Sequence, residues 1–413
     1  MNDTIHTHTF PNGLTLIAEP MDWLESAAFT LMLPAGAIYE PASRLGLSGF
    51  TTEMLQRGSG ERSSREFVDD LENLGVDYSA GVSVAHSTFG ASMLAETLPE
   101  ALAIFADVMR RPHLDEEEVE DTRQGCLQEL RSLDDDPPQQ VFIELRRRQY
   151  PDPWGRNTQG SRDSIEAISI DDIRSFFSQQ FQPQGAILSV AGKLDWETTR
   201  ETVWKLFGDW QPLKSPDLIE IPAEGNYAHL PFQSQQTHLA VAYPSVPYSH
   251  PDYYQAWGAM SVLGSGMSSR LFTEIRENRG LCYTVSAGYN SLKDRGSIRC
   301  YSGTRAERAQ ETLDVLLSEL SLFAQGIRKE ELDRVQARIK TVLILQQESS
   351  RSRSASNAGD WYFLGRVPSL SEVHRIIDGL TCESINNYLA ANPPGNYTIV
   401  TLGPKPLEVR LGV

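Results

Sequence analysis

Apolar and polar residues follow two different periods along the first half of the chain. Residues 4–19 form two alternating runs around Asn12-Gly13, a pattern typical of a β-hairpin. The apolar run 27–33 predicts a buried strand, and the period-two alternation of 77–94 predicts two more strands. Apolar residues at helical spacing predict helices over 45–57, 67–74, 99–109, 116–133, 139–148 and 170–181.

The second half of the chain repeats this order of elements. Segment 169–193 predicts a helix, a Pro/Gly turn and a strand, and 381–405 predicts the same three elements in the same order. The strand at 239–243 parallels 27–33, and the helices at 306–323 and 329–347 parallel two helices of the first half. Two copies of one unit are typical of an internal duplication, and chance recurrence of helix–strand punctuation is the alternative. We therefore expect an α+β fold of two homologous halves, each a sheet covered by helices.

A proline-rich stretch separates the two halves. Residues 212–236 contain Pro212, Pro216, Pro222 and Pro231 and show little periodicity, which is typical of a linker. The sequence thus predicts an N-terminal domain over 1–211, a linker over 212–236 and a C-terminal domain over 237–413.

Charge and cysteine content exclude several classes of function. The formal net charge of −18 disfavours a nucleic-acid partner, because phosphates require a basic surface. The four cysteines are far apart and form no C-x-x-C pair, so neither a disulfide framework nor a zinc finger is expected. We find no signal-peptide pattern and no apolar run long enough to span a membrane, and we expect a cytoplasmic protein.

One stretch, Leu263–Ala287, places an arginine and a tyrosine where they can meet. Ser268 or Ser269 can cap a helix that carries Arg276 in its last turn, and Gly280 suits a left-handed C-terminal cap. The strand that follows is expected to place Tyr283 on the same face as its apolar neighbours Leu281 and Val285.

Arg276 and Tyr283 are seven residues apart and converge at this helix end. A guanidinium and a phenol in this position could polarise a carbonyl or hold an oxyanion. An arginine matched to a helix C-terminus and a tyrosine in a half-buried strand is the simpler interpretation, and the spacing leaves both open.

Several strings in the chain resemble the pitrilysin/insulinase-type zinc peptidases, whose motif is the inverted His-x-x-Glu-His. FPNGLTLIAEP resembles the opening hairpin of that family, GLSGFTTEML its zinc-site helix, and CLQEL its downstream glutamate segment. PWGRNTQGS and MSSRLFTEIRENRGLCYTV are also similar to family segments. The resemblance covers nearly the whole chain, and it implies two homologous halves that form a half-shell.

The zinc motif of the family is degenerate in this chain. The resemblance aligns its two histidines and its glutamate with Gly49, Glu53 and Thr52, and its third ligand, a downstream glutamate, with Glu129. Two carboxylates without an imidazole make a poor zinc site, and threonine is no general base at neutral pH. The other histidines are isolated, apart from His6 and His8. We therefore expect no metal on this chain and no peptide hydrolysis by this chain alone.

The resemblance implies a role for the arginine and the tyrosine. In active members an Arg/Tyr pair with this spacing binds the substrate carbonyl and the tetrahedral intermediate, and Arg276 and Tyr283 match it. Some bacterial members are heterodimers in which one subunit carries zinc and the other carries this pair. The chain is similar to the second kind, which implies a zinc-bearing homologous partner with Zn²⁺ on that partner and a peptide or unfolded polypeptide substrate.

Two other functions remain open at this stage. A catalytically inert scaffold, like the core proteins of the respiratory cytochrome complex, would use the same fold without chemistry. A homodimer that binds peptides without cleaving them is the third possibility. Co-purification from the native cell separates the three, which predict a zinc-bearing homologue, a membrane complex and no other protein, respectively.

Overall fold

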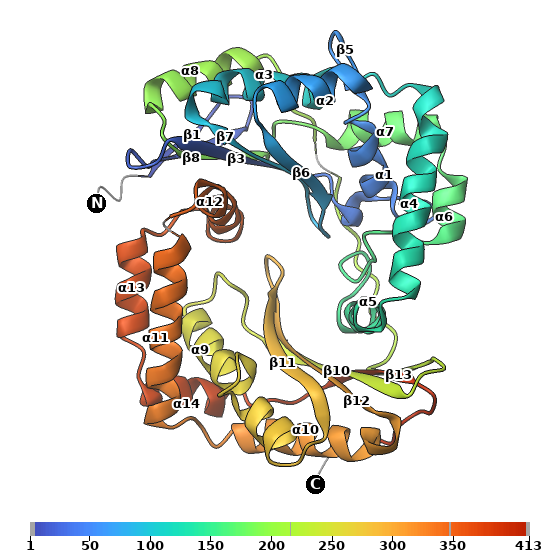
Figure 1. Cartoon of the computed structure of the whole chain (residues 1–413), viewed down its shortest axis with the longest axis vertical. Helices are drawn as coiled ribbons and strands as arrows, with labels where there is room; N and C mark the ends of the chain where they lie inside the picture. The colour runs from blue at the N-terminus through green and yellow to red at the C-terminus, as the bar shows by residue number, and fades with distance from the viewer. Residues whose placement is uncertain (1–4, 215, 347, 410–413) are drawn as a thin grey trace. The chain divides into compact units, whose positions relative to one another are not determined.

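The computed structural model describes residues 5–214, 216–346 and 348–409, which fold into two compact units (Figure 1). The N-terminal unit comprises 1–132, 151–221 and 344–369, and the C-terminal unit comprises 133–150, 222–343 and 370–413. Neither unit is continuous, because each contains one segment from the other half of the chain. Thr4 of the expected hairpin, Ser215 of the expected linker and Gln347 of an expected helix lie outside the described residues.

A six-stranded mixed sheet forms the centre of the N-terminal unit. Its strands, in spatial order, are β1 (His6–Thr9), β2 (Thr15–Pro20), β8 (Ile187–Gly192), β3 (Ser26–Leu33), β7 (Ser87–Leu94) and β6 (Asp77–Val82). β2 and β8 pair in parallel and every other neighbouring pair is antiparallel. The hairpin predicted around Asn12-Gly13 is confirmed, with Thr9 opposite Thr15 in the register.

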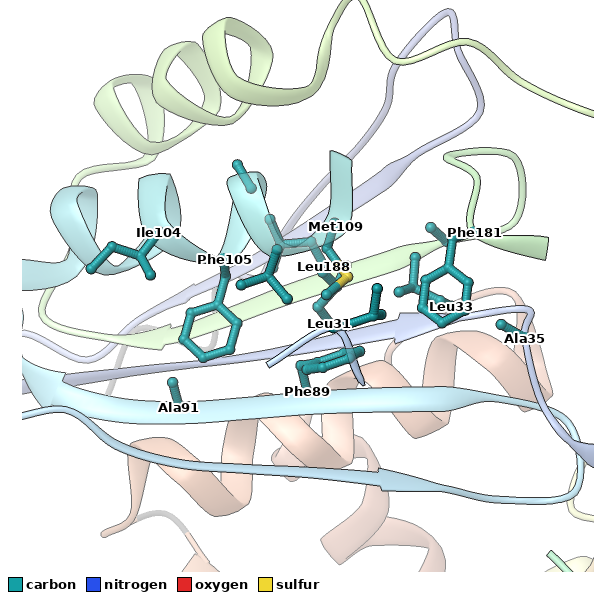
Figure 2. Close-up of a cluster of buried hydrophobic side chains, with 14 of the residues drawn as sticks. Leu31, Leu33, Ala35, Phe89, Ala91, Ile104, Phe105, Met109, Phe181 and Leu188 are labelled. Carbon is teal, nitrogen blue, oxygen red and sulfur yellow. The ribbon is translucent and has the colours of Figure 1, made fainter. Parts of the chain in front are cut away.

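Helices cover one face of this sheet and enclose the main core. They are α1 (Leu47–Met54), α2 (Ser64–Asn73), α3 (Leu98–Arg110), α4 (Val119–Asp134), α6 (Arg162–Ala167), α7 (Ile170–Gln180) and α8 (Trp196–Phe207). Figure 2 shows Phe105 and Met109 of α3 directed at Leu31, Phe89 and Leu188 of the sheet. Burying such side chains stabilises the unit by about 1.5–3 kcal/mol each. The apolar stripes that predicted α1, α2, α3, α4 and α7 are therefore surfaces that these helices bury, whereas α6 and α8 were not predicted.

The opposite face of the sheet is covered by α12 (Ser350–Leu364), which comes from late in the chain and lies across β3, β7 and β8 (Figure 1). Arg353 of α12 is 2% exposed, and its Nε donates to the carboxylate of Glu19 on β2 at 2.8 and 3.1 Å. Asn357 donates to the same carboxylate at 2.7 Å. A buried, hydrogen-bonded ion pair thus joins this helix to the first half of the chain.

The C-terminal unit repeats the sheet. Its strands, in spatial order, are β9 (Tyr227–Pro231), β13 (Thr398–Gly403), β10 (Gln236–Ser245), β12 (Gly296–Arg305) and β11 (Cys282–Ser291). β9 and β13 pair in parallel, as β2 and β8 do, and the other pairs are antiparallel. The duplication expected from the sequence is therefore visible in the strand order. β9 lies inside the stretch 212–236, which was expected to be a linker. This part of the stretch is a strand because its backbone pairs with that of β13.

The helices of the C-terminal unit are α9 (Tyr253–Gly264), α10 (Ala309–Phe323), α11 (Lys329–Gln346), α13 (Leu370–Asp378), α14 (Cys382–Ala391) and α5 (Pro137–Gln149). α5 comes from the first half of the chain and packs Val141 and Leu145 against Ala240 and Val400 of the sheet. α5 and α12 are thus exchanged between the two halves. Among the described residues, no helix has the length and apolarity that crossing a membrane requires.

Candidate functional site

Helix α1 carries three of the four positions that the sequence aligned with a zinc motif, and a buried carboxylate fixes where this helix begins. Glu40 accepts hydrogen bonds from the backbone N–H groups of Gly46 and Ser48, both at 2.9 Å. Burial raises the pKa of Glu40 to about 7, and its hydrogen bonds and Arg156 oppose that rise. Phe50 is fully buried, and of the candidate residues Thr52 is also buried, Gly49 is half-buried and Glu53 is exposed.

These positions meet in a pocket of about 130 Å³ within the N-terminal unit. Gly49, Thr52 and Glu53 of α1 line it, together with Glu129 of α4. The structure therefore brings together the four residues that the sequence singled out as the degenerate motif. Segments of β6 and residues 158–159 form the remaining walls.

Cys126, which was not among the residues expected at this site, lines the same pocket. Cys126 precedes Glu129 by three residues on α4, so helical periodicity alone would have placed both side chains on one face. Desolvation raises the pKa of the Cys126 thiol to about 12, and the charges of Glu53 and Glu129 add to that effect. The thiol is therefore protonated in the metal-free chain, and a metal could bind there only by displacing that proton.

The remaining side chains do not fit a zinc ion either. Gly49 offers no ligand atom, and the Thr52 hydroxyl lies 3.0 Å from Ser87 Oγ. Ser87 donates its own proton to the carbonyl of Ala35, so Thr52 is the donor in that pair. No histidine is among the residues that line the pocket. Within the described parts of the chain, no three His, Cys, Asp or Glu side chains are placed to hold a metal.

The second candidate group lies in the C-terminal unit, on the π-helical segment η4 (Phe272–Glu277). The wider turn is visible in the bond from Asn278 N to the carbonyl of Thr273, five residues earlier, at 2.9 Å. The expected serine cap is wrong, because Ser269 Oγ donates back to the carbonyl of Gly266 at 2.7 Å. Gly280 has the expected left-handed conformation, with φ of 58°.

The two arginines of this segment have different surroundings. Arg279 donates to the carboxylate and to the carbonyl of Glu274, at 2.7 and 2.8 Å. The Arg276 guanidinium has no hydrogen bond or ion pair with any residue that the structure describes, and its Cζ lies 4.7 Å from the ring centroid of Phe272. The Arg276 guanidinium therefore keeps all its N–H groups available for a ligand, whereas that of Arg279 is held by Glu274 through Nη1.

Tyr283 stands out from strand β11 because of a β-bulge. Cys282 pairs with Thr304 and Thr284 with Gly303, so Tyr283 is the extra residue between them. Tyr283 is 81% exposed while Leu281 and Val285 are buried, and the expectation that the three share a face is therefore wrong. An extra residue interrupts the alternation on which that expectation depended.

Arg276 and Tyr283 meet as the sequence predicted. The Arg276 Cζ lies 5.2 Å from the centroid of the Tyr283 ring, so the guanidinium sits against both this ring and that of Phe272. Such cation–π contacts orient the guanidinium without using its N–H donors. The Tyr283 hydroxyl has no partner among the described residues, so it and the Arg276 guanidinium are both available to donate to a ligand.

Comparison with known proteins places the chain in a family. The model of the insulinase family, peptidase family M16, matches residues 20–160, and that of the peptidase M16 inactive domain matches 167–339. A Bacillus subtilis protein described as an uncharacterized zinc protease is 25% identical over 404 residues, covering 97% of this chain and 98% of the relative. A Rickettsia bellii protein with the same description is 24% identical and covers 99% of this chain and 100% of the relative.

Solved structures show the same fold. The peptidase M16 inactive domain from Pseudomonas fluorescens superposes with a TM-score of 0.88 at 22% identity, covering 99% of this chain and 100% of that structure. A protease from Helicobacter pylori also has a TM-score of 0.88, at 21% identity, and covers 97% of this chain and 99% of that structure. The two family models together span most of the sequence, and the chain belongs to peptidase family M16, the insulinase family.

Proposed function

We propose that this chain is the non-zinc-binding subunit of a heterodimeric M16 peptidase. In this proposal a homologous partner holds Zn²⁺ and activates water, and this chain contributes Arg276 and Tyr283. The observation that carries the proposal is the state of Arg276, which is held between two aromatic rings with its N–H groups unused, beside the exposed phenol of Tyr283.

The composition of the pocket on α1 supports the proposal that zinc is bound by the partner and not by this chain. Its walls hold Glu53 and Glu129, which stand where the family motif has metal ligands, but no imidazole and no ionised thiol. Desolvation by the pocket walls raises the pKa of Glu53, with Glu129 adding to the rise and Arg57 opposing it. A carboxylate in such surroundings binds a cation weakly unless further ligands complete the shell.

The chemistry of the Arg/Tyr pair suits carbonyl activation. Arg276 presents a planar fork of N–H donors, and Tyr283 presents a single O–H donor. When water attacks a peptide carbonyl, negative charge develops on its oxygen, and donors already in place stabilise that charge without reorganising. The rings of Phe272 and Tyr283 restrict the guanidinium to this position before substrate arrives.

The decisive experiment co-expresses this chain with a zinc-bearing M16 homologue from the same genome and assays the purified complex with a quenched peptide. Arg276→Ala and Tyr283→Phe should each lower kcat by about 10²–10³, the usual cost of one lost oxyanion donor. Arg279→Ala is the matched control, because Arg279 is on the same turn but is bound to Glu274. Its kcat should equal that of the wild type.

Two results would contradict the proposal. If no zinc-bearing homologue co-purifies, the chain is not a subunit of such an enzyme. If the complex forms and both variants keep a normal kcat, the chain is a scaffold and the Arg/Tyr pair has no part in hydrolysis.

A further inference from the structure

A second group of basic side chains lies on one face of the C-terminal sheet, away from the Arg/Tyr pair. Gly288 of β11 is opposite Arg299 of β12, and Asn290 is opposite Ser297, so these four residues share one face of the sheet. Helix α5 packs on the same face, where Phe142 contacts the ring of Tyr301 at 5.6 Å between centroids. This face is distinct from the one that α9 and α10 cover.

Arg299 is held in place by neutral groups alone. Its Cζ lies 5.6 Å from the ring centroid of Tyr150, and its Nε donates to Gln149 Oε1 at 3.4 Å. Its Nη2 is buried and has no hydrogen-bond partner. A buried guanidinium nitrogen without an acceptor is costly, so this atom is the first indication that a ligand belongs here.

Arg146 adds a second cation one helical turn before Tyr150. The N–H of Tyr150 donates to the carbonyl of Arg146 at 3.0 Å, which places both side chains on the same side of α5. The next two arginines of the helix bind Glu144, Arg147 at 2.8 Å and Arg148 at 2.6 Å. The Arg146 guanidinium has no hydrogen bond or ion pair in the described chain, although the residue is only partly exposed.

The guanidiniums of Arg146 and Arg299, neither of which has an ion pair in the described chain, also interact electrostatically. Desolvation lowers the pKa of Arg146 and of Arg299, and the positive charge of Arg146 lowers that of Arg299 further. No carboxylate contributes to either pKa, although the chain as a whole carries a formal charge of −18. Two desolvated cations that repel each other destabilise the free protein, and a bound anion would reduce that cost.

A hydrogen-bonded chain sets the arrangement in advance. Asn290 Nδ2 donates to the Tyr150 oxygen at 2.8 Å, so the Tyr150 proton is free to go to Ser297 Oγ at 2.9 Å. Ser297 then donates to Gln149 Oε1, the same atom that accepts from Arg299. The ring under Arg299 is therefore held by two neutral partners, Asn290 and Ser297, and Gln149 orients the guanidinium before an anion binds.

We infer that Arg146 and Arg299 form a binding site for a carboxylate carried by an extended polypeptide. Guanidinium forks match the planar, two-oxygen geometry of a carboxylate. A Cβ built on Gly288, directly opposite Arg299, would meet no atom within 4 Å, so a ligand can approach the backbone there. The exposed residues Thr284 and Ser286 continue this open strand face towards Tyr283.

The position of the site also suggests how a substrate would be selected. Gly288 is five residues from Tyr283 along β11, about 17 Å at strand spacing. An extended peptide whose carbonyl is bound by Arg276 and Tyr283 would then place an acidic residue or its own C-terminal carboxylate, some five residues away, at Arg146 and Arg299. This placement rests on the proposed function, whereas carboxylate binding itself does not.

The test uses the purified full chain without a partner and three fluorescent peptides in the same Gly/Ser/Val background. One has an internal Glu and an amidated C-terminus, one has Gln in its place and an amidated C-terminus, and one has Gln and a free C-terminal carboxylate. By fluorescence anisotropy, at least one carboxylate-bearing peptide should bind about 10- to 100-fold more tightly than the neutral one, the range for charge-assisted hydrogen bonds. The acidic peptide that binds identifies the source of the carboxylate.

Arg146→Gln and Arg299→Gln should each abolish that preference, and Arg147→Gln, next along the same helix but paired with Glu144, should keep it. Thermal unfolding of the variants checks folding, and because each removes a desolvated cation, both should be at least as stable as the wild type. Equal binding of all three peptides, an equal loss with Arg147→Gln, or binding of inorganic phosphate without any preference among the peptides would each overturn the inference.

Failure of this site and failure of the proposed function give different results. In the active complex, Arg299→Gln should raise KM for the acidic peptide and leave kcat unchanged, whereas Arg276→Ala should lower kcat. If the peptides bind as expected but Arg276→Ala has no effect on kcat, the carboxylate site stands and the catalytic proposal fails.

Discussion

Restoring the zinc motif tests whether the pocket on α1 is the place that the sequence assigned to the metal. The change is Gly49→His, Thr52→Glu and Glu53→His, which would put two imidazoles one helical turn apart and opposite Glu129. A Cβ on Gly49 would meet only the carbonyl oxygen of Thr158, at 3.6 Å, which is ordinary van der Waals contact. The first substitution should therefore enter without a backbone shift and gain a few tenths of a kcal/mol in helix propensity.

The second substitution carries the main cost. Thr52 is 1% exposed and donates to Ser87, so Thr52→Glu loses about 1 kcal/mol of hydrogen bonding and a further ~1–3 kcal/mol to overpacking. Ser87 keeps its bond to the carbonyl of Ala35 and is not left unsatisfied. Glu53 is exposed, so its replacement should change stability by no more than about 0.5 kcal/mol. A net loss of roughly 2–4 kcal/mol is within the stability of an ordinary domain.

Bound zinc should return part of this loss. We expect the triple variant to bind about one zinc per chain in equilibrium dialysis, with a Tm that rises on adding metal, since 100-fold excess over Kd stabilises by about 2.7 kcal/mol. The same variant with Gly49 retained is the control and should bind far less, because one imidazole is missing. If the folded triple variant takes up no zinc, or if Glu129→Gln does not weaken its binding, the assigned register of 46–55 is wrong.

Three further predictions concern the wild-type chain. Purified alone, it should contain far less than one zinc per molecule and cleave no peptide. This prediction is contradicted if elemental analysis finds one zinc per chain and Glu129→Ala abolishes that zinc binding. Because burial raises the pKa of Glu40 from 4.5 to about 7, the folded chain binds a proton that the unfolded chain has lost, and stability should fall as pH rises through this window, by up to about 3 kcal/mol. Denaturation at pH 5 and pH 8 should show that Glu40→Gln flattens this dependence, and an unchanged slope would refute the assignment. Arg353→Ala removes the ion-pair partner of Glu19 and should lower the free energy of unfolding by about 3–5 kcal/mol. Arg351→Ala removes an exposed ion pair and should lower it by about 1 kcal/mol or less. Equal unfolding midpoints for the two variants would refute the role of the Arg353–Glu19 pair.

Much of the local structure followed from the sequence, because short-range interactions decide it. Ser63 and Glu66 form the capping box that opens α2, as their spacing indicates, and Asn12-Gly13 makes the hairpin turn. The loss of both imidazole ligands, at Gly49 and Glu53, and of the general base, at Thr52, is equally a property of residue identity. The meeting of Arg276 with Tyr283 needed only one helix end and one adjoining strand, so a seven-residue spacing was sufficient to predict it.

Tertiary structure decided the features that depend on distant partners. An apolar stripe predicted that α5 buries one face, but not that it buries Val141 against Val400 in the other half of the chain. The exposure of Tyr283 depends on a bulge, and a bulge arises from pairing with β12 and leaves no mark on the alternation. Arg146 and Arg299 are more than a hundred residues apart in sequence and became one site only when α5 packed on β12. Hydrophobic burial favours any face that excludes water, so the sequence pattern determines which residues are buried, while the complete fold determines what they are buried against.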